Sequence, residues 1–196
     1  MAGTIVTNPS DYFRQLAETS SQIDAQQIVA YADMLFDAWR RRARVFVFGN
    51  GGSAYNASHH VTDYVKTASV DGRERLMAFS LTDNFGLTTA VGNDLSYAES
   101  LSFPLESYGQ AGDVAVGISC SGNSPNLLKA FEVARRRGMK IVALTGFAGG
   151  KAKSCVDLHI NVPSENYGII EDLHLSIGHI VAQMLLDHVA KESKSS

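Results

Sequence analysis

Short apolar runs and stretches with helical periodicity alternate along most of this chain, and their order predicts the fold class. Five short runs are typical of strands, and the last of them alternates polar with apolar positions, as an edge strand does: residues 45–48, 76–81, 114–118, 141–144 and 157–162. Helical patterns separate or follow them, over residues 53–65, 86–91, 97–108, 125–137 and 168–190. This alternation predicts an α/β protein whose parallel sheet is covered by helices on both faces.

Two further helices are predicted before the first strand, over residues 11–17 and 23–39. The second carries an apolar stripe made by Ile28, Tyr31, Ala32, Leu35 and Trp39. Because these helices lie outside the strand–helix alternation, we expect a neighbouring subunit to cover their apolar faces. We expect one domain over residues 1–196, with N-terminal helices at about 9–42 and a core at about 44–190.

Composition and charge narrow the class of protein. The chain has 196 residues, 45% of them hydrophobic and 19% charged, which is ordinary for a soluble globular domain. Its net charge of −3 gives no general attraction to nucleic acid or anionic membrane, so neither is expected as a partner. Two isolated cysteines, no visible signal peptide and no apolar run of transmembrane length predict a cytoplasmic protein.

The most informative motifs are two turns rich in glycine and serine, at residues 48–54 and 117–126. Each follows a predicted strand and precedes a predicted helix, so backbone N–H groups, hydroxyls and a helix N-terminus converge on one spot and favour a phosphate. Neither turn contains lysine, and neither fits a P-loop or a dinucleotide fingerprint. We therefore expect a phosphorylated small molecule rather than a nucleotide, bound at the carboxyl ends of the strands. The alternative is that these residues merely build tight turns.

A second constellation has the residue types of a metal or acid–base site. His59 and Asp63 are four residues apart on one predicted helix, and Glu171 and His179 are two turns apart on the closing helix. Imidazoles and carboxylates suit zinc or another divalent ion, and they also suit proton transfer between two carbons. The alternative is a set of solvated or structural side chains. The remaining histidines of interest are interpreted as structural, namely His60, His159, His174 and His188.

Taken together, these motifs resemble those of sugar isomerase (SIS) domain proteins, and among them most closely the phosphoheptose isomerases. The similarity covers roughly residues 10–190 and includes segments 49–54, 57–59, 81–83, 91–94, 111–113, 118–126, 143–146, 149–150, 162–164, 171–174 and 177–179. It implies a flavodoxin-like sheet, a homotetramer and active sites between subunits.

The resemblance also implies roles for individual residues. It implies a zinc ion or another divalent metal held by His59, Asp63, Glu171 and His179, with Asp63, Glu171 and His179 as the acid–base residues. It implies a substrate site that is formed by Asn50, Gly51, Gly52, Ser53, Asp94, Ser119, Ser121, Ser124 and Glu171. The serines of this set would hold the phosphate.

The chain departs from the family pattern at several of these positions. Asp63 replaces a glutamate, Glu171 replaces a glutamine, and Thr67, next to Lys66, stands where the family has a basic residue. Segment 166–170 lacks the family's usual Asp/Arg pattern. A set of two imidazoles and two carboxylates is nevertheless retained.

The leading hypothesis is an aldose–ketose isomerase that converts sedoheptulose 7-phosphate to D-glycero-D-manno-heptose 7-phosphate through an enediol(ate). One alternative is a non-catalytic SIS module that binds a sugar phosphate or a replication-initiator protein. A second is an isomerase of a different sugar phosphate in polysaccharide biosynthesis. Metal content and isomerase turnover discriminate the enzyme from the binding module.

Overall fold

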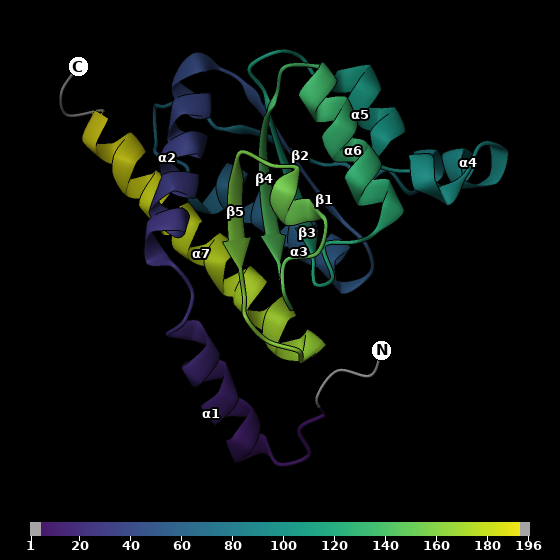
Figure 1. The fold of residues 1–196 in the computed structure, drawn as a ribbon. Coiled ribbons are helices and arrows are strands. Elements are labelled where there is room, and N and C mark those ends of the chain that lie inside the picture. The colour runs from purple at the N-terminus through teal and green to yellow at the C-terminus, as the bar shows by residue number, and fades with distance from the viewer. Residues whose placement is uncertain (1–4, 193–196) are drawn as a thin grey trace.

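A computed structural model of the protein describes residues 5–192 (Figure 1). Its strands are β1 Arg44–Gly49, β2 Met77–Ser80, β3 Val114–Ser119, β4 Lys140–Thr145 and β5 Leu158–Asn161. All neighbouring strands are parallel, and they form one sheet in the order β2-β1-β3-β4-β5. The predicted parallel α/β sheet is confirmed, and β5 lies at an edge as its alternating pattern indicates.

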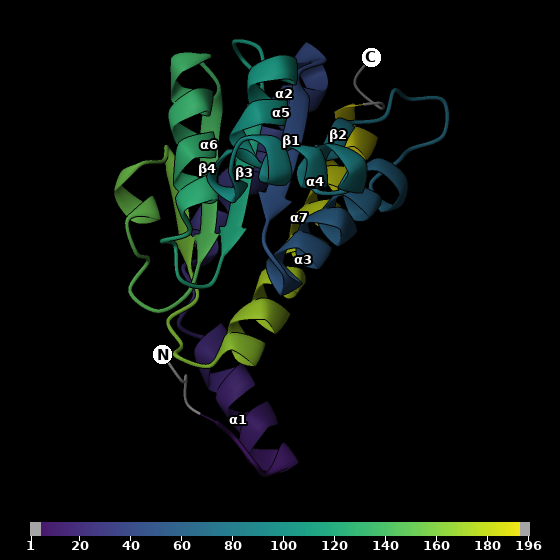
Figure 2. The ribbon, with the colours of Figure 1, turned by 90° about the vertical axis from the view of Figure 1, so that its right-hand side faces the viewer.

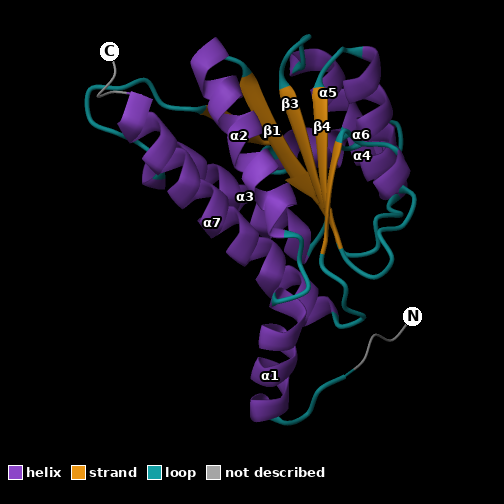
Figure 3. Cartoon of the chain, turned by 60° about the vertical axis from the view of Figure 1, so that its left-hand side comes forward, coloured by secondary structure: helices purple, strands orange, loops and turns teal. Residues whose placement is uncertain are grey.

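Helices cover both faces of the sheet. They are α1 Pro9–Ser20, α2 Ala25–Arg41, α3 Gly52–Thr62, α4 Phe85–Asp94, α5 Ser102–Tyr108, α6 Pro125–Arg136 and α7 Tyr167–Glu192. Figures 2 and 3 show α2, α3 and α7 on one face, with α5 and α6 on the other. The core is accordingly split into two clusters of buried side chains, one on each side of the sheet.

The apolar stripe of α2 is buried within this chain. Its covered residues are Ile28, Tyr31, Ala32, Leu35 and Ala38, with exposed fractions of 9% or less. They pack into the same cluster as the buried side chains of α7. The expectation that a second subunit covers this stripe is therefore wrong for α2, because α7 and the sheet supply the partner surface.

Helix α1 differs from α2 because it extends away from the sheet, as all three ribbon views show (Figures 1–3). The hydroxyl of Tyr12 donates a 2.7 Å hydrogen bond to Asp172 on α7 and ties the helix to the body. Phe13 remains 67% exposed. The part of the N-terminal segment that leaves apolar surface uncovered is thus α1.

The predicted helix over residues 97–108 is interrupted. Tyr97–Glu99 forms a short 3-10 turn, and α5 starts only at Ser102. Pro104 explains the break, since proline has no N–H to donate and its ring clashes with the carbonyl four residues earlier, at Ser100.

Helix α7 is the structural centre of its layer. It is long and apolar enough to span a membrane by length and composition alone, but half of its most apolar window is buried inside the protein. It packs against α1, α2 and α3. Its hydrophobicity is therefore explained by its place in the core.

Two histidines in this layer are fully buried. Nε2 of His60 donates to the carbonyl of His174 at 2.9 Å, and Nε2 of His174 donates to the carbonyl of Thr145 at 3.0 Å. Nδ1 of His174 is buried without a hydrogen-bond partner among the described residues. Burial lowers the pKa of each imidazole to about 4. Both side chains are structural, as predicted.

These buried imidazoles predict an acid-sensitive fold. The unfolded chain takes up protons at the ordinary histidine pKa of 6.5, whereas the folded chain resists protonation until about 4. The contribution of these histidines to the free energy of unfolding is therefore fully present above about pH 6.5. It is lost as the pH falls towards 4, by about 3 kcal/mol for each histidine. Denaturant unfolding measured across this range should show that decline, and a flat profile would contradict it.

Candidate active site

The two glycine- and serine-rich turns lie side by side at the carboxyl edge of the sheet. Gly49, at the end of β1, is in register with Ile118, near the end of β3. From β1 the chain continues to β2 on one side of the sheet, and the later strands β3, β4 and β5 are added on the other side. Ligands of open α/β sheets bind at such a switch point. The fold thus brings both predicted phosphate turns to the place where a ligand is expected.

The turn after β3 presents three serine side chains. The hydroxyl of Ser119 accepts a 3.2 Å hydrogen bond from Gly122 N–H, and that of Ser121 accepts one of 3.2 Å from Asn123 N–H. Ser124 stands at the N-cap of α6 but makes no side-chain cap within the described chain. Its hydroxyl can therefore serve a ligand without loss to the helix.

The turn after β1 is joined to the start of α6 by a pair of amides. Asn50 and Asn126 exchange hydrogen bonds of 2.9 and 2.8 Å, and Asn126 is 1% exposed. Tyr97 adds a third bond, because its hydroxyl donates to Asn50 at 2.8 Å. Asn50, predicted to contact sugar, therefore holds the two turns together. Sequence reasoning missed this role for Asn126, since only the tertiary fold reveals its partner.

Other predicted substrate residues occupy different parts of this edge. Gly51 is the N-cap of α3, where Gly52 and the buried Ser53 begin the helix. Asp94 is the last residue of α4, on the exposed surface, and its carboxylate accepts a 2.8 Å hydrogen bond from Asn93.

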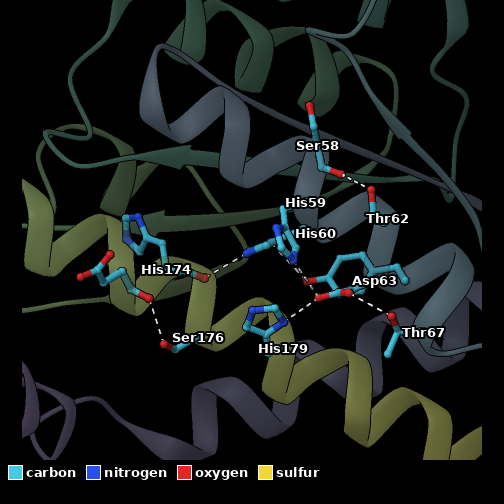
Figure 4. Close-up of polar contacts among 11 residues, drawn as sticks. Ser58, His59, His60, Thr62, Asp63, Thr67, His174, Ser176 and His179 are labelled. Atoms are coloured by element: carbon cyan, nitrogen blue, oxygen red, sulfur yellow. Dashed lines mark hydrogen bonds and ion pairs between the residues drawn. The ribbon is translucent and has the colours of Figure 1, made fainter.

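Three of the four predicted metal ligands come together between α3 and α7 (Figure 4). His59 and Asp63 face His179, and one donor atom from each lies within 4.8 Å of the other two. The Asp63 carboxylate accepts a 2.7 Å hydrogen bond from Nδ1 of His179 and lies 3.7 Å from Nε2 of His59. Asp63 is 8% exposed, so two partly exposed imidazoles bracket a nearly buried carboxylate.

Close packing of the two helices creates this cluster. Gly178, directly before His179, lies against the His60 ring, which would overlap any side chain built on the glycine. His60 in turn bonds to the backbone of α7 at His174. The absence of a side chain at position 178 thus allows α3 and α7 to approach closely enough for Asp63 to reach His179.

Glu171, the fourth predicted ligand, lies elsewhere on α7. Its carboxylate sits over Gly52, where an added Cβ would come within 2.6 Å of the carboxyl carbon. Cys120 Sγ is 3.9 Å from Oε1. Burial, followed by the charge of Asp172, raises the Glu171 pKa. Burial raises the pKa of the Cys120 thiol to about 12, which leaves it unreactive.

The candidate residues therefore form two groups along the α3–α7 contact. Eight residues separate Glu171 from His179, which is about 12 Å along a helix. Ten residues separate Ser53 from Asp63, which is about 15 Å if the helical rise is uniform. Within one chain, Glu171 is next to the serine turns, and the His59–Asp63–His179 cluster lies further along the same helices.

Comparison with known proteins identifies the family. The model of the SIS domain matches residues 11–146. A phosphoheptose isomerase of Chlorobaculum tepidum is 37% identical over 176 residues, which cover 89% of this chain and 84% of that protein. The chain belongs to the SIS-domain family, among the phosphoheptose isomerases.

Solved structures agree with this assignment to the SIS-domain family. The phosphoheptose isomerase of Francisella tularensis superposes with a TM-score of 0.83 at 28% identity, over 90% of this chain and 95% of that one. The phosphoheptose isomerase of Neisseria gonorrhoeae has a TM-score of 0.82 at 30% identity, over 90% and 93% of the two chains. Each of these two structural matches covers 90% of this chain.

Proposed function

We propose that this SIS-domain protein is an aldose–ketose isomerase that converts sedoheptulose 7-phosphate to D-glycero-D-manno-heptose 7-phosphate. Family membership supports an isomerase of this kind. The observation that carries the proposal in this chain is the His59–Asp63–His179 cluster, because a module that only binds sugar phosphate has no need of a hydrogen-bonded acid–base pair.

The same cluster is proposed to hold a zinc ion, or another divalent ion. The donor set fits such an ion, since it combines two imidazoles and a carboxylate whose ligand atoms are already close. Because Glu171 of the same chain lies over Gly52 and away from this cluster, Glu171 of a neighbouring subunit is proposed as the fourth ligand and as an acid–base residue. A bound ion would supply a Lewis acid that stabilises the enediolate oxygen.

The chain's own residues are proposed to position the sugar and move the proton. Ser53, Ser119, Ser121 and Ser124 hold the phosphate and thereby fix the distant carbonyl end of the sugar. A base removes a proton from C1 of the ketose while an acid protonates the carbonyl oxygen on C2, which gives the enediol. Return of a proton to C2 and loss of the proton from the C1 hydroxyl then give the aldose. Asp63 orients the His179 ring by accepting its Nδ1 proton, and the two side chains are proposed as the pair that relays the proton.

We further propose a cytoplasmic homotetramer with active sites completed between subunits. The exposed Phe13 on the projecting α1 and the separation of the two groups of site residues along α3 and α7 support such an assembly. The free thiols of Cys120 and Cys155 suit a reducing compartment. Light scattering of the active protein should give the mass of four chains, and a stable, active monomer would contradict the proposal.

Changing Ser124 to alanine should weaken substrate binding more than stability. The hydroxyl does not cap α6, so its loss leaves the fold intact while one phosphate contact disappears. We expect KM for the sugar phosphate to rise about tenfold, the equivalent of one hydrogen bond to a charged group. Ser107→Ala, on the exposed part of α5, is the matched control and should leave KM unchanged. Equal KM values for both variants would exclude Ser124 from the phosphate site.

An isomerisation assay tests the proposed function directly. Purified protein is incubated with sedoheptulose 7-phosphate or with shorter ketose phosphates, products are identified by NMR, and bound metal is quantified. Turnover of the seven-carbon substrate with bound divalent metal supports the proposal. Turnover restricted to another ketose phosphate supports an isomerase of different specificity. Neither turnover nor metal supports a binding module.

A further inference from the structure

A π-turn follows α3 and begins at Asp63, the central residue of the His59–Asp63–His179 cluster. It spans Asp63–Thr67, and Ala68 N–H donates to the Asp63 carbonyl at 2.8 Å, five residues back rather than four. Such turns are rare and occur frequently at functional sites. The sequence pattern predicts an uninterrupted helix over residues 53–65 and gives no sign of this extra residue in the turn.

The π-turn contains a hydrogen bond between its first and last residues. Thr67 Oγ1 donates to Oδ1 of Asp63 at 3.0 Å (Figure 4). The other carboxylate oxygen, Oδ2, faces the histidines, at 2.7 Å from His179 Nδ1 and 3.7 Å from His59 Nε2. One carboxylate oxygen of Asp63 therefore bonds to Thr67, and the other faces the two histidines.

This division matters because Asp63 has a short side chain. Its carboxylate rotates about one terminal bond, so fixing Oδ1 also sets the direction of Oδ2. The side chain is only 11% exposed, which leaves little water to satisfy Oδ1 if its partner is removed. An ionised carboxylate only accepts hydrogen bonds, so the threonine hydroxyl is a suitable donor.

We propose that Thr67 is a positioning residue that aims Asp63 Oδ2 at the metal site and at His179. This inference rests on the proposed function of the cluster. Thr67 acts through Asp63, to which its hydroxyl donates. Partners of this kind orient metal ligands, and their loss typically costs about 10- to 100-fold in metal affinity or activity.

The test compares Thr67→Val, which keeps the shape but removes the hydroxyl, with Thr67→Ser, which keeps the donor. Thr62→Val is the matched control, because Thr62 bonds to the carbonyl of Ser58 instead of a carboxylate. Zinc affinity is measured by competition with a chromophoric chelator, and the visible spectrum of the cobalt-loaded protein reports ligand geometry. Thr67→Val should weaken zinc binding about tenfold or more and alter the cobalt spectrum. Thr67→Ser and Thr62→Val should match wild type.

Equal affinities for Thr67→Val and wild type, or equal losses in Thr67→Val and Thr62→Val, would overturn the proposal for Thr67. Failure of the metal proposal is separately visible, since His59→Ala would then bind zinc as wild type does. In that case a crystal structure of metal-free Thr67→Val decides the positioning role. Asp63 Oδ2 turned away from His179 supports it, and an unchanged 2.7 Å contact overturns it.

Discussion

Replacing Asp63 by asparagine should lower kcat/KM by about 10²- to 10⁴-fold, the usual contribution of a positioned proton-transfer group. The amide is nearly isosteric but carries no charge, and with one acceptor oxygen it cannot take hydrogen bonds from both His179 Nδ1 and Thr67 Oγ1 as the carboxylate does. Zinc affinity should fall as well, because one anionic ligand is lost. Steady-state kinetics and metal quantification on the same preparation measure both effects.

The partner variant His179→Ala should lower turnover at least tenfold, which corresponds to about 1.4 kcal/mol in the barrier. Its circular dichroism spectrum should match wild type, because His179 is partly exposed. Thr62→Val serves again as the neutral control on the adjacent helix. If Asp63→Asn and His179→Ala both keep full activity and metal content, the chain is better described as a phosphate-binding SIS module.

Replacing Gly178 by alanine should destabilise the fold and also displace Asp63 from His179, the proposed acid–base pair. The added methyl group would overlap the ring of His60, which is fully buried and bonded to α7, so the ring cannot move aside. Overpacking of this kind costs about 1–3 kcal/mol. Denaturant unfolding should show this decrease in the free energy of unfolding. Activity should fall by more than the fraction of unfolded protein explains, because α3 and α7 separate at Asp63 and His179.

Gly86→Ala in α4 is the matched control. An added Cβ there meets only Asn84 Oδ1, at an ordinary 3.7 Å. Alanine is a better helix former than glycine, so this variant should be neutral or slightly more stable. A Gly178→Ala protein with wild-type stability and activity would show that the close helix contact is not needed.

The fold class could be predicted because parallel sheets leave a clear sequence signal. Segments such as 114–118 and 141–144 are buried on both faces and therefore read as continuous apolar runs. Helix boundaries were less predictable. Asn8, Pro9 and Asp24 carry the signals that start α1 and α2, yet the predicted starts lie two residues off in each case.

The two glycine- and serine-rich turns and the residue types of the His59–Asp63–His179 cluster were also predictable from sequence. Turn chemistry and the spacing of His59 and Asp63 on one helix are local, so a single segment contains the information. The pairing of both turns at one edge follows once the strands are assigned, since carboxyl ends of parallel strands share that edge.

Contacts between distant segments were decided by the tertiary structure alone. The strand order puts Asn50 against Asn126, and a glycine on α7 brings His179 to Asp63. The same packing places Glu171 over Gly52, away from the cluster. Local sequence determines which face of a helix a side chain occupies, but helix-to-helix distance depends on the summed packing of the core. The sequence by itself thus determined the sheet, the turns and the chemical types at the site, and only the packing of α3 against α7 decided which of those groups meet.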